Sequence, residues 1–175
     1  MRFEYSVGDP NSDERGSGAR ANGGKPQMDL IPIRAWLDIW SCHAEVHNEL
    51  YSILGWLADW QEGDEDALHH VMQDHVCGQD AIHAVRVLEY GVKKYAAWNW
   101  AKGMKWSIPV GCILRHSKAI FNGERVDPES GCEHIGHVIA NLVMLQHFQT
   151  CCPDLNDIQV PALSQSWHLK ERENG

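Results

Sequence analysis

Apolar residues recur along this chain at helical spacing, and the alternation typical of strands is nearly absent. From Leu30 to about Trp60 the apolar positions follow the i, i+3, i+4, i+7 pattern of a helix with one buried side. Gly63 interrupts this pattern within an acidic stretch. A short amphipathic piece, Ala67–Cys77, and a longer one, Gln79–Ala96, come next. The pattern predicts an all-α protein, folded as a compact helical bundle.

The most informative part of the pattern is a pair of segments near the C-terminal end. The first, from about Pro109 to Phe121, is a helix that Gly123 ends. The second, which ends near Phe148, is apolar in nearly every direction, as in a fully buried helix. Its polar exceptions form one stripe at i, i+3 and i+7: His134, His137 and Asn141. Since buried polar groups need partners, the stripe predicts a metal, a ligand or a polar network; histidines satisfied within the core are the alternative.

The acidic loop between these two segments strengthens the prediction of a site. It carries Glu124, Asp127 and Glu129, and Pro128 and Gly131 mark it as a turn. Alone it would be an ordinary solvated turn. Because it lies between His116 and the histidines of the stripe, it can supply oxygen ligands to Mg²⁺ or Mn²⁺. His70 and Asp74, at i, i+4 in the short amphipathic piece, form a rival candidate that we interpret as surface.

Length and composition define the organisation of the chain. The 175 residues fit a single helical domain at 29–150, preceded by a flexible N-terminal arm at 1–28 and followed by a loosely packed tail at 151–175. The arm is polar and glycine-rich, but Arg20 and Lys25 with the intervening glycine pair could wrap a phosphate.

Charge and cysteine content exclude several functions. A net charge of −9 argues against non-specific nucleic-acid binding, although a metal can still neutralise the phosphates of a nucleotide. We expect no membrane span and no secretory signal, because no apolar run is long enough and the first 20 residues lack an apolar core. The 6 cysteines include no C-x-x-C pair, so we expect reduced thiols and a cytoplasmic location.

Cations and aromatic residues alternate after the Gln79–Ala96 segment. Lys93, Lys94 and Lys102 could hold a polyphosphate, and Tyr95 or Trp100 could stack on a base. The alternative is a lysine pair at a helix end followed by an aromatic core loop. The high tryptophan count, 8 residues, also leaves apolar surface for contacts between copies, and we expect a homo-oligomer.

Several motifs in order resemble the phage dATP/dGTP diphosphohydrolase N-terminal-type domain over most of residues 18–148. They are Gly18-x-Arg20, Gly24-Lys25-Pro26, Asp29-Leu30-Ile31-Pro32, Tyr90-Gly91-x-Lys93-Lys94-Tyr95, Asn99-Trp100, Arg115-His116, Gly123-Glu124-x-x-Asp127-x-Glu129-Ser130-Gly131, His134, His137 and Asn141. Relative to that family, residues 38–78 look like an insertion. The last helix is also similar in layout to the E-x-x-D helix of MazG-like all-α pyrophosphohydrolases, with histidines in place of acids.

The resemblance implies metal-dependent release of pyrophosphate from purine deoxynucleoside triphosphates by a phage enzyme that edits the nucleotide pool of the host cytoplasm. On this hypothesis water attacks phosphorus, and Mg²⁺, Mn²⁺ or, given the histidines, another transition metal stabilises the charge. The candidate metal ligands are His116, Asp127, Glu129, His134 and His137. Glu124, by elimination, is the candidate general base, with His116 as a second catalytic candidate.

The remaining candidates bind substrate. Phosphate contacts are assigned to Arg20, Lys25, Lys93, Lys94, Lys102 and Arg115, and base or ribose contacts to Tyr95, Asn99, Trp100 and Asn141. Two alternatives stay open: an HD-type enzyme that releases triphosphate, against which the missing His-Asp dipeptide counts, and a non-catalytic helical protein that binds a nucleotide.

Overall fold

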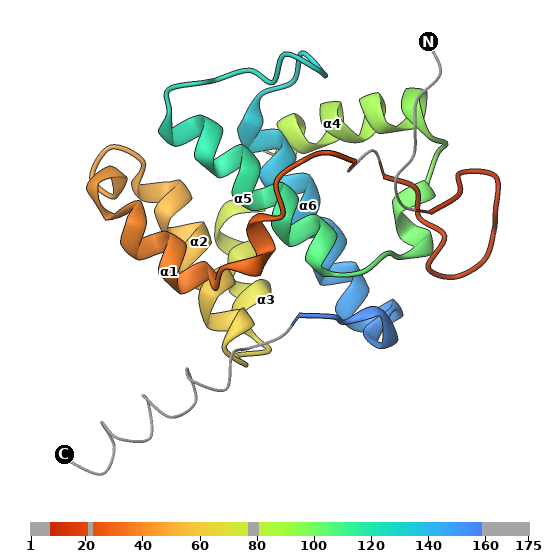
Figure 1. The fold of residues 1–175 in the computed structure, drawn as a ribbon, viewed down its shortest axis with the longest axis horizontal. Coiled ribbons are helices and arrows are strands. Elements are labelled where there is room, and N and C mark those ends of the chain that lie inside the picture. Colours follow the sequence, from red (N-terminus) through yellow and green to blue (C-terminus); the bar gives the residue numbers. More distant parts are fainter. Residues whose placement is uncertain (1–7, 21–22, 77–80, 159–175) are drawn as a thin grey trace.

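Helices and turns make up the computed structural model, which describes residues 8–20, 23–76 and 81–158 (Figure 1). Within these residues the prediction of an all-α fold is confirmed: no strand is present, and one isolated bridge joins Val126 to Glu133. The elements in chain order are η1 Met28–Leu30, α1 Ile33–Ile39, η2 Ser41–His43, α2 Asn48–Gln61, α3 Ala67–Val71, the π-helical turn η3 Met72–Val76, α4 Ala81–Lys94, η4 Asn99–Lys102, α5 Ser107–Phe121, α6 His134–Cys151 and η5 Pro153–Leu155. No helix in the described ranges is long and apolar enough to span a membrane.

Helix α6 is the centre of the bundle, as its apolar surface on all sides predicts. It packs along α5 on one side and across α4 on another, and α3 contacts it from below in the view of Figure 1. Gly136 allows the close crossing with α4, because a Cβ atom there would lie 2.5 Å from the backbone oxygen of His83. The polar stripe of α6 is therefore enclosed by neighbouring helices, and His134, His137 and Asn141 are all buried.

The continuous helical pattern predicted from Leu30 to Trp60 is wrong in one respect, because the segment folds back on itself. Helix α1 ends at Ile39, because the next residue, Trp40, leaves the helical region with a φ of −95° and a ψ of 9°, and α2 begins only at Asn48. The two helices then pack side by side (Figure 1). A single straight helix of this length would extend roughly 45 Å and leave one apolar half uncovered, whereas the hairpin turns both halves onto one core.

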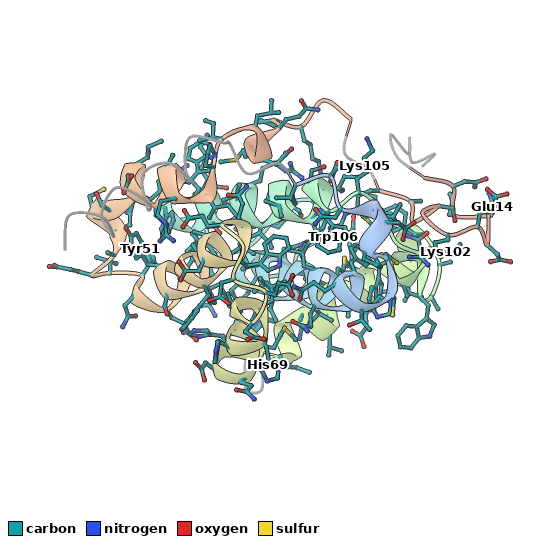
Figure 2. All side chains as sticks on the ribbon, turned by 90° about the horizontal axis from the view of Figure 1, so that it is seen from below. Glu14, Tyr51, His69, Lys102, Lys105 and Trp106 are labelled. Atoms are coloured by element: carbon teal, nitrogen blue, oxygen red, sulfur yellow. The ribbon has the colours of Figure 1, made fainter. Side chains whose placement is uncertain are left out.

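Residues 8–20, part of the expected flexible arm, pack against the turn that contains η4. The side-chain amide of Asn99 forms two hydrogen bonds with the backbone of Ala19, accepting from its N–H at 3.1 Å and donating to its oxygen at 3.0 Å. The Lys102 ammonium donates to the backbone oxygens of Pro10 and Ser12, and Figure 2 shows Lys102 beside the segment that carries Glu14. These contacts place Arg20, at the end of the segment, over the helical core.

Some of the helix and domain ends that the sequence predicts fall on residues that the structure does not describe. The end of the Ala67–Cys77 piece and the start of the Gln79–Ala96 piece lie outside the described residues, as does most of the 151–175 tail. In residues 151–158, Asp157 accepts hydrogen bonds from the backbone and hydroxyl of Ser107, which ties this stretch to the start of α5.

Candidate active site

Three histidines from two helices meet between α5 and α6. His116 on α5 stacks on His137 of α6, with ring centroids 4.1 Å apart and planes only 8° from parallel. The Nδ1 atoms of His116 and His134 lie 2.7 Å apart, a hydrogen-bond distance. The stripe predicted on α6 and the histidine predicted at the edge of the core on α5 therefore form one cluster.

The loop between the helices orients His137. The Ser130 hydroxyl donates to Asp127 Oδ2 at 2.7 Å, and Ser130 Oγ lies 2.8 Å from His137 Nε2. Because the serine proton is used by the carboxylate, His137 must donate its Nε2–H to Ser130. This arrangement assigns the proton of the neutral ring to Nε2 and leaves the lone pair on Nδ1.

A parallel chain orients His116 through His134. Glu124 Oε2 lies 4.0 Å from His134 Nε2, which is buried and has no hydrogen-bond partner among the described residues. A proton on that nitrogen faces the carboxylate, so His134 Nδ1 is left to accept from the Nδ1–H of His116. The lone pair of His116 is then on Nε2. The ring of His137 is thus held by hydrogen bonds that end at Asp127, and the ring of His116 by a hydrogen bond to His134, whose other nitrogen faces Glu124 across 4.0 Å.

Burial keeps these imidazoles neutral. It lowers the pKa of His116 to about 4 and that of His137 to about 3, and the opposing effect of Asp127 is smaller. The pKa of His134 is lowered as well, first by burial and then by His116. Burial is the largest influence on the pKa of Asp127 and would raise it, but the hydrogen bonds from the hydroxyl and backbone of Ser130, the backbone of Glu129 and the nearby His137 together lower it. At neutral pH the cluster consists of neutral rings beside an ionised carboxylate.

These shifts predict a loss of stability in mild acid. A histidine in the unfolded chain titrates near pH 6.5. Below that pH the unfolded chain binds protons at positions 116 and 137, whereas His116 and His137 in the folded protein stay neutral because their pKa values are lower. The free energy of unfolding should fall between pH 6.5 and about 4, by up to about 2 kcal/mol for each ring at pH 5. Urea unfolding at pH 7.5 and pH 5.0 in EDTA measures this. Carboxylates with lowered pKa lose their contribution only below their ordinary range, so they do not interfere.

The matched variant is His116→Phe, which keeps an aromatic ring stacked on His137. It should remove roughly half of the difference between the two pH values. An unfolding midpoint that stays the same from pH 7.5 to 5.0 in the wild-type protein would contradict the assignment of neutral buried rings.

Four cations border the stacked histidines in one polar pocket, which we call the cationic pocket. Its lining includes Arg20, Lys25, Lys94 and Arg115, together with His116, Asp127, Glu129, His137 and Asn141. Lys94 is only 8% exposed and forms an ion pair with Glu129, and Lys25 Nζ lies 3.2 Å from the same carboxylate. Arg20 donates to Asn141, which in turn donates to the backbone oxygen of His137.

The charges of this pocket hold one another in place. Burial is the largest influence on the pKa of Lys94 and would lower it, yet Glu129, Tyr95 and Tyr90 together leave that pKa raised. The Lys94 ammonium lowers the pKa of Glu129 in return. Glu129 was predicted as a metal ligand, but the structure pairs it with two lysines and not with the histidines.

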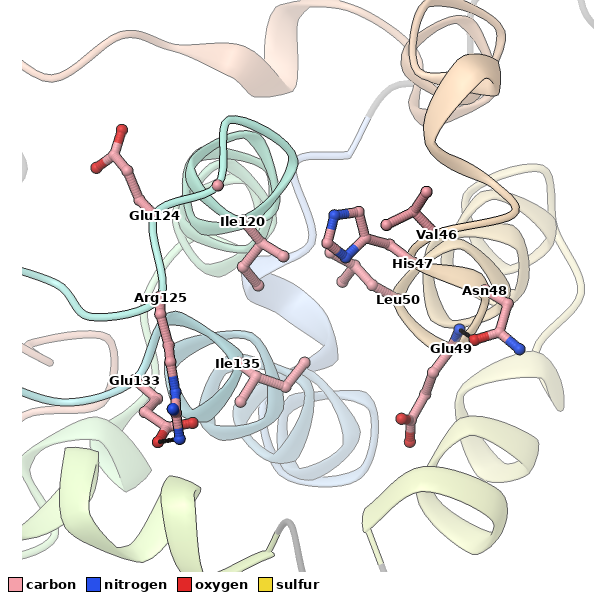
Figure 3. Close-up of a pocket in the computed structure, with 11 residues that line it drawn as sticks. Val46, His47, Asn48, Glu49, Leu50, Ile120, Glu124, Arg125, Glu133 and Ile135 are labelled. Carbon is pink, nitrogen blue, oxygen red and sulfur yellow. Dashed lines mark hydrogen bonds and ion pairs between the residues drawn. The ribbon is translucent and has the colours of Figure 1, made fainter.

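Other predicted site residues lie away from the cationic pocket. Lys93 is exposed on α4, while Asn99 and Lys102 hold residues 8–20, so none of the three lines the pocket. Glu124 lies at the edge of a second pocket, which we call the lateral pocket, between the start of α2, the end of α5 and the start of α6 (Figure 3). Glu49 and Glu133 also line the lateral pocket, so its charge does not suit a polyphosphate.

Tyr95 and Trp100 were predicted to contact a base, and they line an apolar pocket that adjoins the cationic one. Tyr95 borders both pockets. The ring of Trp100 is fixed edge-on against His147, at 5.2 Å between centroids. The rival pair His70 and Asp74 is exposed, and His70 lies against Trp56.

Three residues in or beside the cationic pocket were not predicted as site residues from the sequence: Tyr90 and Cys112 line it, and Ser130 bonds to Asp127 and His137. Ser130 was considered only as a helix cap, although Asp-x-x-Ser is a spacing at which a hydroxyl can reach the carboxylate. Cys112 accepts a weak hydrogen bond from Asn141 at 3.4 Å. Tyr90 lies one helical turn before Lys94, whose ammonium is 5.8 Å from the ring centre. Position on α4 and α5 could have suggested the last two, because both are on the side that faces α6.

The donor atoms suit a divalent ion in their chemistry but are not arranged as a closed cage. Within the described ranges, no group of three or more His, Cys, Asp or Glu side chains is placed to hold a metal ion. The two oriented lone pairs, on His116 Nε2 and His137 Nδ1, are nevertheless of the type that transition metals bind. Ligating histidines commonly donate their other N–H to an orienting chain of this kind.

Comparison with known proteins gives one finding. A family model described as dATP/dGTP diphosphohydrolase, N-terminal, matches residues 60–158. The match includes α4, α5 and α6 and therefore all three clustered histidines, whereas Arg20 and Lys25 lie outside it. It also includes residues 60–78, the second part of the suggested insertion. No curated protein and no solved structure matches the chain.

Proposed function

Because the chain belongs to the dATP/dGTP diphosphohydrolase N-terminal family, we propose that it hydrolyses purine deoxynucleoside triphosphates to monophosphate and pyrophosphate. The observation that carries the proposal is the cationic pocket itself. In a protein with a net charge of −9, Arg20, Lys25, Lys94 and Arg115 gather beside two neutral imidazoles. Such a concentration of cations suits a polyphosphate, and its position beside the histidines places the reacting phosphorus next to groups that can assist hydrolysis.

A divalent metal is part of this proposal, with His137 as a protein ligand, because the parallel rings of His116 and His137 cannot both hold one ion in their planes. The metal would neutralise phosphate charge and lower the pKa of a water molecule. Phosphate oxygens of the substrate supply further ligands in many phosphoryl-transfer sites, which is consistent with a pocket that has no complete cage of its own. Because imidazole favours transition metals over Mg²⁺, we expect Mn²⁺ or a similar ion to support the highest rate.

The orienting chains define the other roles. Asp127 acts on His137 through Ser130, and Glu124 acts on His116 through His134. The oxygen of water forms the new bond to phosphorus, the bond to the leaving pyrophosphate breaks, and the water proton must be accepted. Glu124, the candidate base, lies at the edge of the lateral pocket. We propose that His116 accepts the water proton at Nε2 while its Nδ1 proton passes to His134, whose Nε2 proton passes to Glu124.

Glu129 has a different proposed role from the one that the sequence suggested. Its carboxylate bridges Lys25 and Lys94 at the position where an anionic ligand of these lysines would lie. We propose that a substrate phosphate displaces Glu129 from the lysines. Substrate binding then also shifts the loop that carries Asp127 and Ser130, and this couples phosphate binding to the orientation of His137.

Pyrophosphate release under steady-state conditions tests the proposed function. The protein is incubated with each of the four deoxynucleoside triphosphates, with Mg²⁺, Mn²⁺ or EDTA, and pyrophosphate is measured by a coupled assay. We expect release from dATP and dGTP, little from the pyrimidines, and loss of activity in EDTA that Mn²⁺ restores. Equal rates of pyrophosphate release with and without EDTA would contradict the proposed metal dependence. The predictions of a homo-oligomer and of a phage origin stay predictions.

A further inference from the structure

The cationic pocket continues into an apolar pocket of about 320 Å³. Arg20, Val87, Gly91 and Tyr95 line both, so the two share a wall. The volume is within the range of small-molecule sites, roughly 300 to 1,000 Å³. A ligand with an anionic part and a flat apolar part would match the change of lining from one pocket to the other.

Helix α4 contributes apolar side chains to the apolar pocket, and no other element among the described residues packs over that face of the helix. Val85, Leu88 and Val92 share one helix face by their spacing and line the pocket, and Val85 and Val92 are 46% and 49% exposed. The sequence pattern predicts this face as the buried side of the helix. Among the described residues nothing covers it, so the structure leaves an apolar wall open beside the phosphate-binding cations.

Trp98 lines the apolar pocket in a strained conformation. It is the one non-glycine residue in the described ranges with a positive φ, 60°, and its side chain is 73% exposed. The indole is 6.1 Å from that of Trp100. A bulky residue with left-handed backbone carries a conformational cost that persists mainly where a function requires it. Asn99, the residue after Trp98, is hydrogen-bonded to the backbone of Ala19. These bonds fix the backbone of the turn and therefore the position of Trp98 at the pocket.

We propose that the apolar pocket binds the purine base of the substrate, with Trp98 stacking on the base and Val85 and Val92 forming the opposite wall. This inference rests on the proposed function, which places the triphosphate in the cationic pocket. A base held mainly by stacking and by apolar contact is selected by the size of its ring system. Purines are therefore favoured over pyrimidines.

One buried polar group of the pocket, Asn99, is not available to distinguish adenine from guanine. The side-chain amide of Asn99, which could otherwise read a base edge, donates to and accepts from the backbone of Ala19. An amide that is buried and bonded to the backbone through both its oxygen and its nitrogen contributes little to base selection. We therefore expect affinities for dATP and dGTP that differ by less than about fivefold.

The test uses Trp98→Gly, because glycine adopts a φ of 60° without strain and the turn should be preserved. Isothermal titration in the presence of Mn²⁺ compares two probes: the α,β-methylene analogue of dATP, which resists hydrolysis, and inorganic triphosphate, which has no base. We expect the variant to bind the analogue about tenfold more weakly and inorganic triphosphate equally well. The melting temperature should change by less than about 3 °C. Trp56→Ala, which removes an indole on α2, is the matched control and should bind both probes normally.

Each other outcome overturns the proposal in a distinguishable way. If wild-type protein binds the analogue and Trp98→Gly binds it equally well, the base lies elsewhere while the proposed function stands. Equal loss of both probes, or a fall in melting temperature, would show a structural role for Trp98. A change in oligomeric state on size exclusion without loss of affinity would assign the apolar face to a second copy of the chain. If wild-type protein neither binds the analogue nor releases pyrophosphate, the proposed function itself fails.

Discussion

The His137→Gln variant is expected to lose dATP hydrolysis by roughly 10²- to 10⁴-fold while it remains folded. His137 stacks on His116 and lines the cationic pocket, and its neutral ring carries an oriented lone pair. Glutamine can still donate to Ser130 from its amide, so the loop should stay in place. It cannot replace the imidazole as a ligand or proton acceptor. The rate of pyrophosphate release at saturating dATP and Mn²⁺ measures the effect, and circular dichroism measures the fold.

His70→Gln is the control for this variant. It removes an imidazole from the exposed surface of α3 and from the rival metal candidate formed with Asp74. We expect its rate to remain within about twofold of the wild-type rate. A normal rate for His137→Gln, or a loss confined to His70→Gln, would move the site away from α5 and α6.

Lys94→Met is expected to raise the KM for dATP by roughly tenfold to a hundredfold, with a smaller change in kcat. Lys94 is a buried cation that faces the cationic pocket, and its long apolar stem can be replaced by methionine. The variant removes one charge-assisted contact to phosphate and should retain the packing of α4. Steady-state kinetics over a range of dATP concentrations separate the two parameters.

Two companion variants define what Lys94 does. Lys93→Met changes the neighbouring, exposed lysine and should leave KM within about threefold. Glu129→Gln removes the carboxylate that occupies the lysines and should lower KM severalfold with kcat preserved. If Glu129→Gln instead abolishes turnover, Glu129 is a metal ligand, as the sequence first suggested, and not a stand-in for phosphate.

The sequence predicted the histidine cluster because its evidence is local. The polar stripe on an otherwise apolar helix required α6 to be central, and the position of His116 beside apolar residues required it to face the core. A loop of twelve residues between two such helices leaves few ways to connect them. These constraints do not depend on the rest of the chain, so they could be read from spacing alone.

The predicted site residues that lie outside the cationic pocket are placed there by contacts with distant parts of the chain. Lys93 and Lys94 are adjacent and chemically the same, and only the rotation of α4 against α6 determines which one faces the pocket. Asn99 and Lys102 are used by residues 8–20, about 80 to 90 positions away. Glu124 follows Gly123, whose φ of 84° turns the chain toward the lateral pocket. Sequence spacing contains no information on any of these contacts.

The break between α1 and α2 has a similar cause. The pattern at 30–60 is helical on both sides of Trp40, and no proline or glycine marks the reversal. The reversal is favoured because both apolar stripes then bury against the same core, a tertiary effect that overrides local propensity. Helix existence was therefore predictable here, while the path of the chain was not.

The most direct test of the central claim is the identity of the products formed from dATP. The wild-type protein is incubated with dATP and Mn²⁺, with and without EDTA, and the nucleotides and phosphates are separated by ion-exchange chromatography. We expect dAMP and pyrophosphate in equal amounts with Mn²⁺, and neither product in EDTA. Deoxyadenosine with triphosphate would assign the chemistry to an HD-type enzyme, and intact dATP with every metal would leave the histidine cluster as a binding site without catalysis.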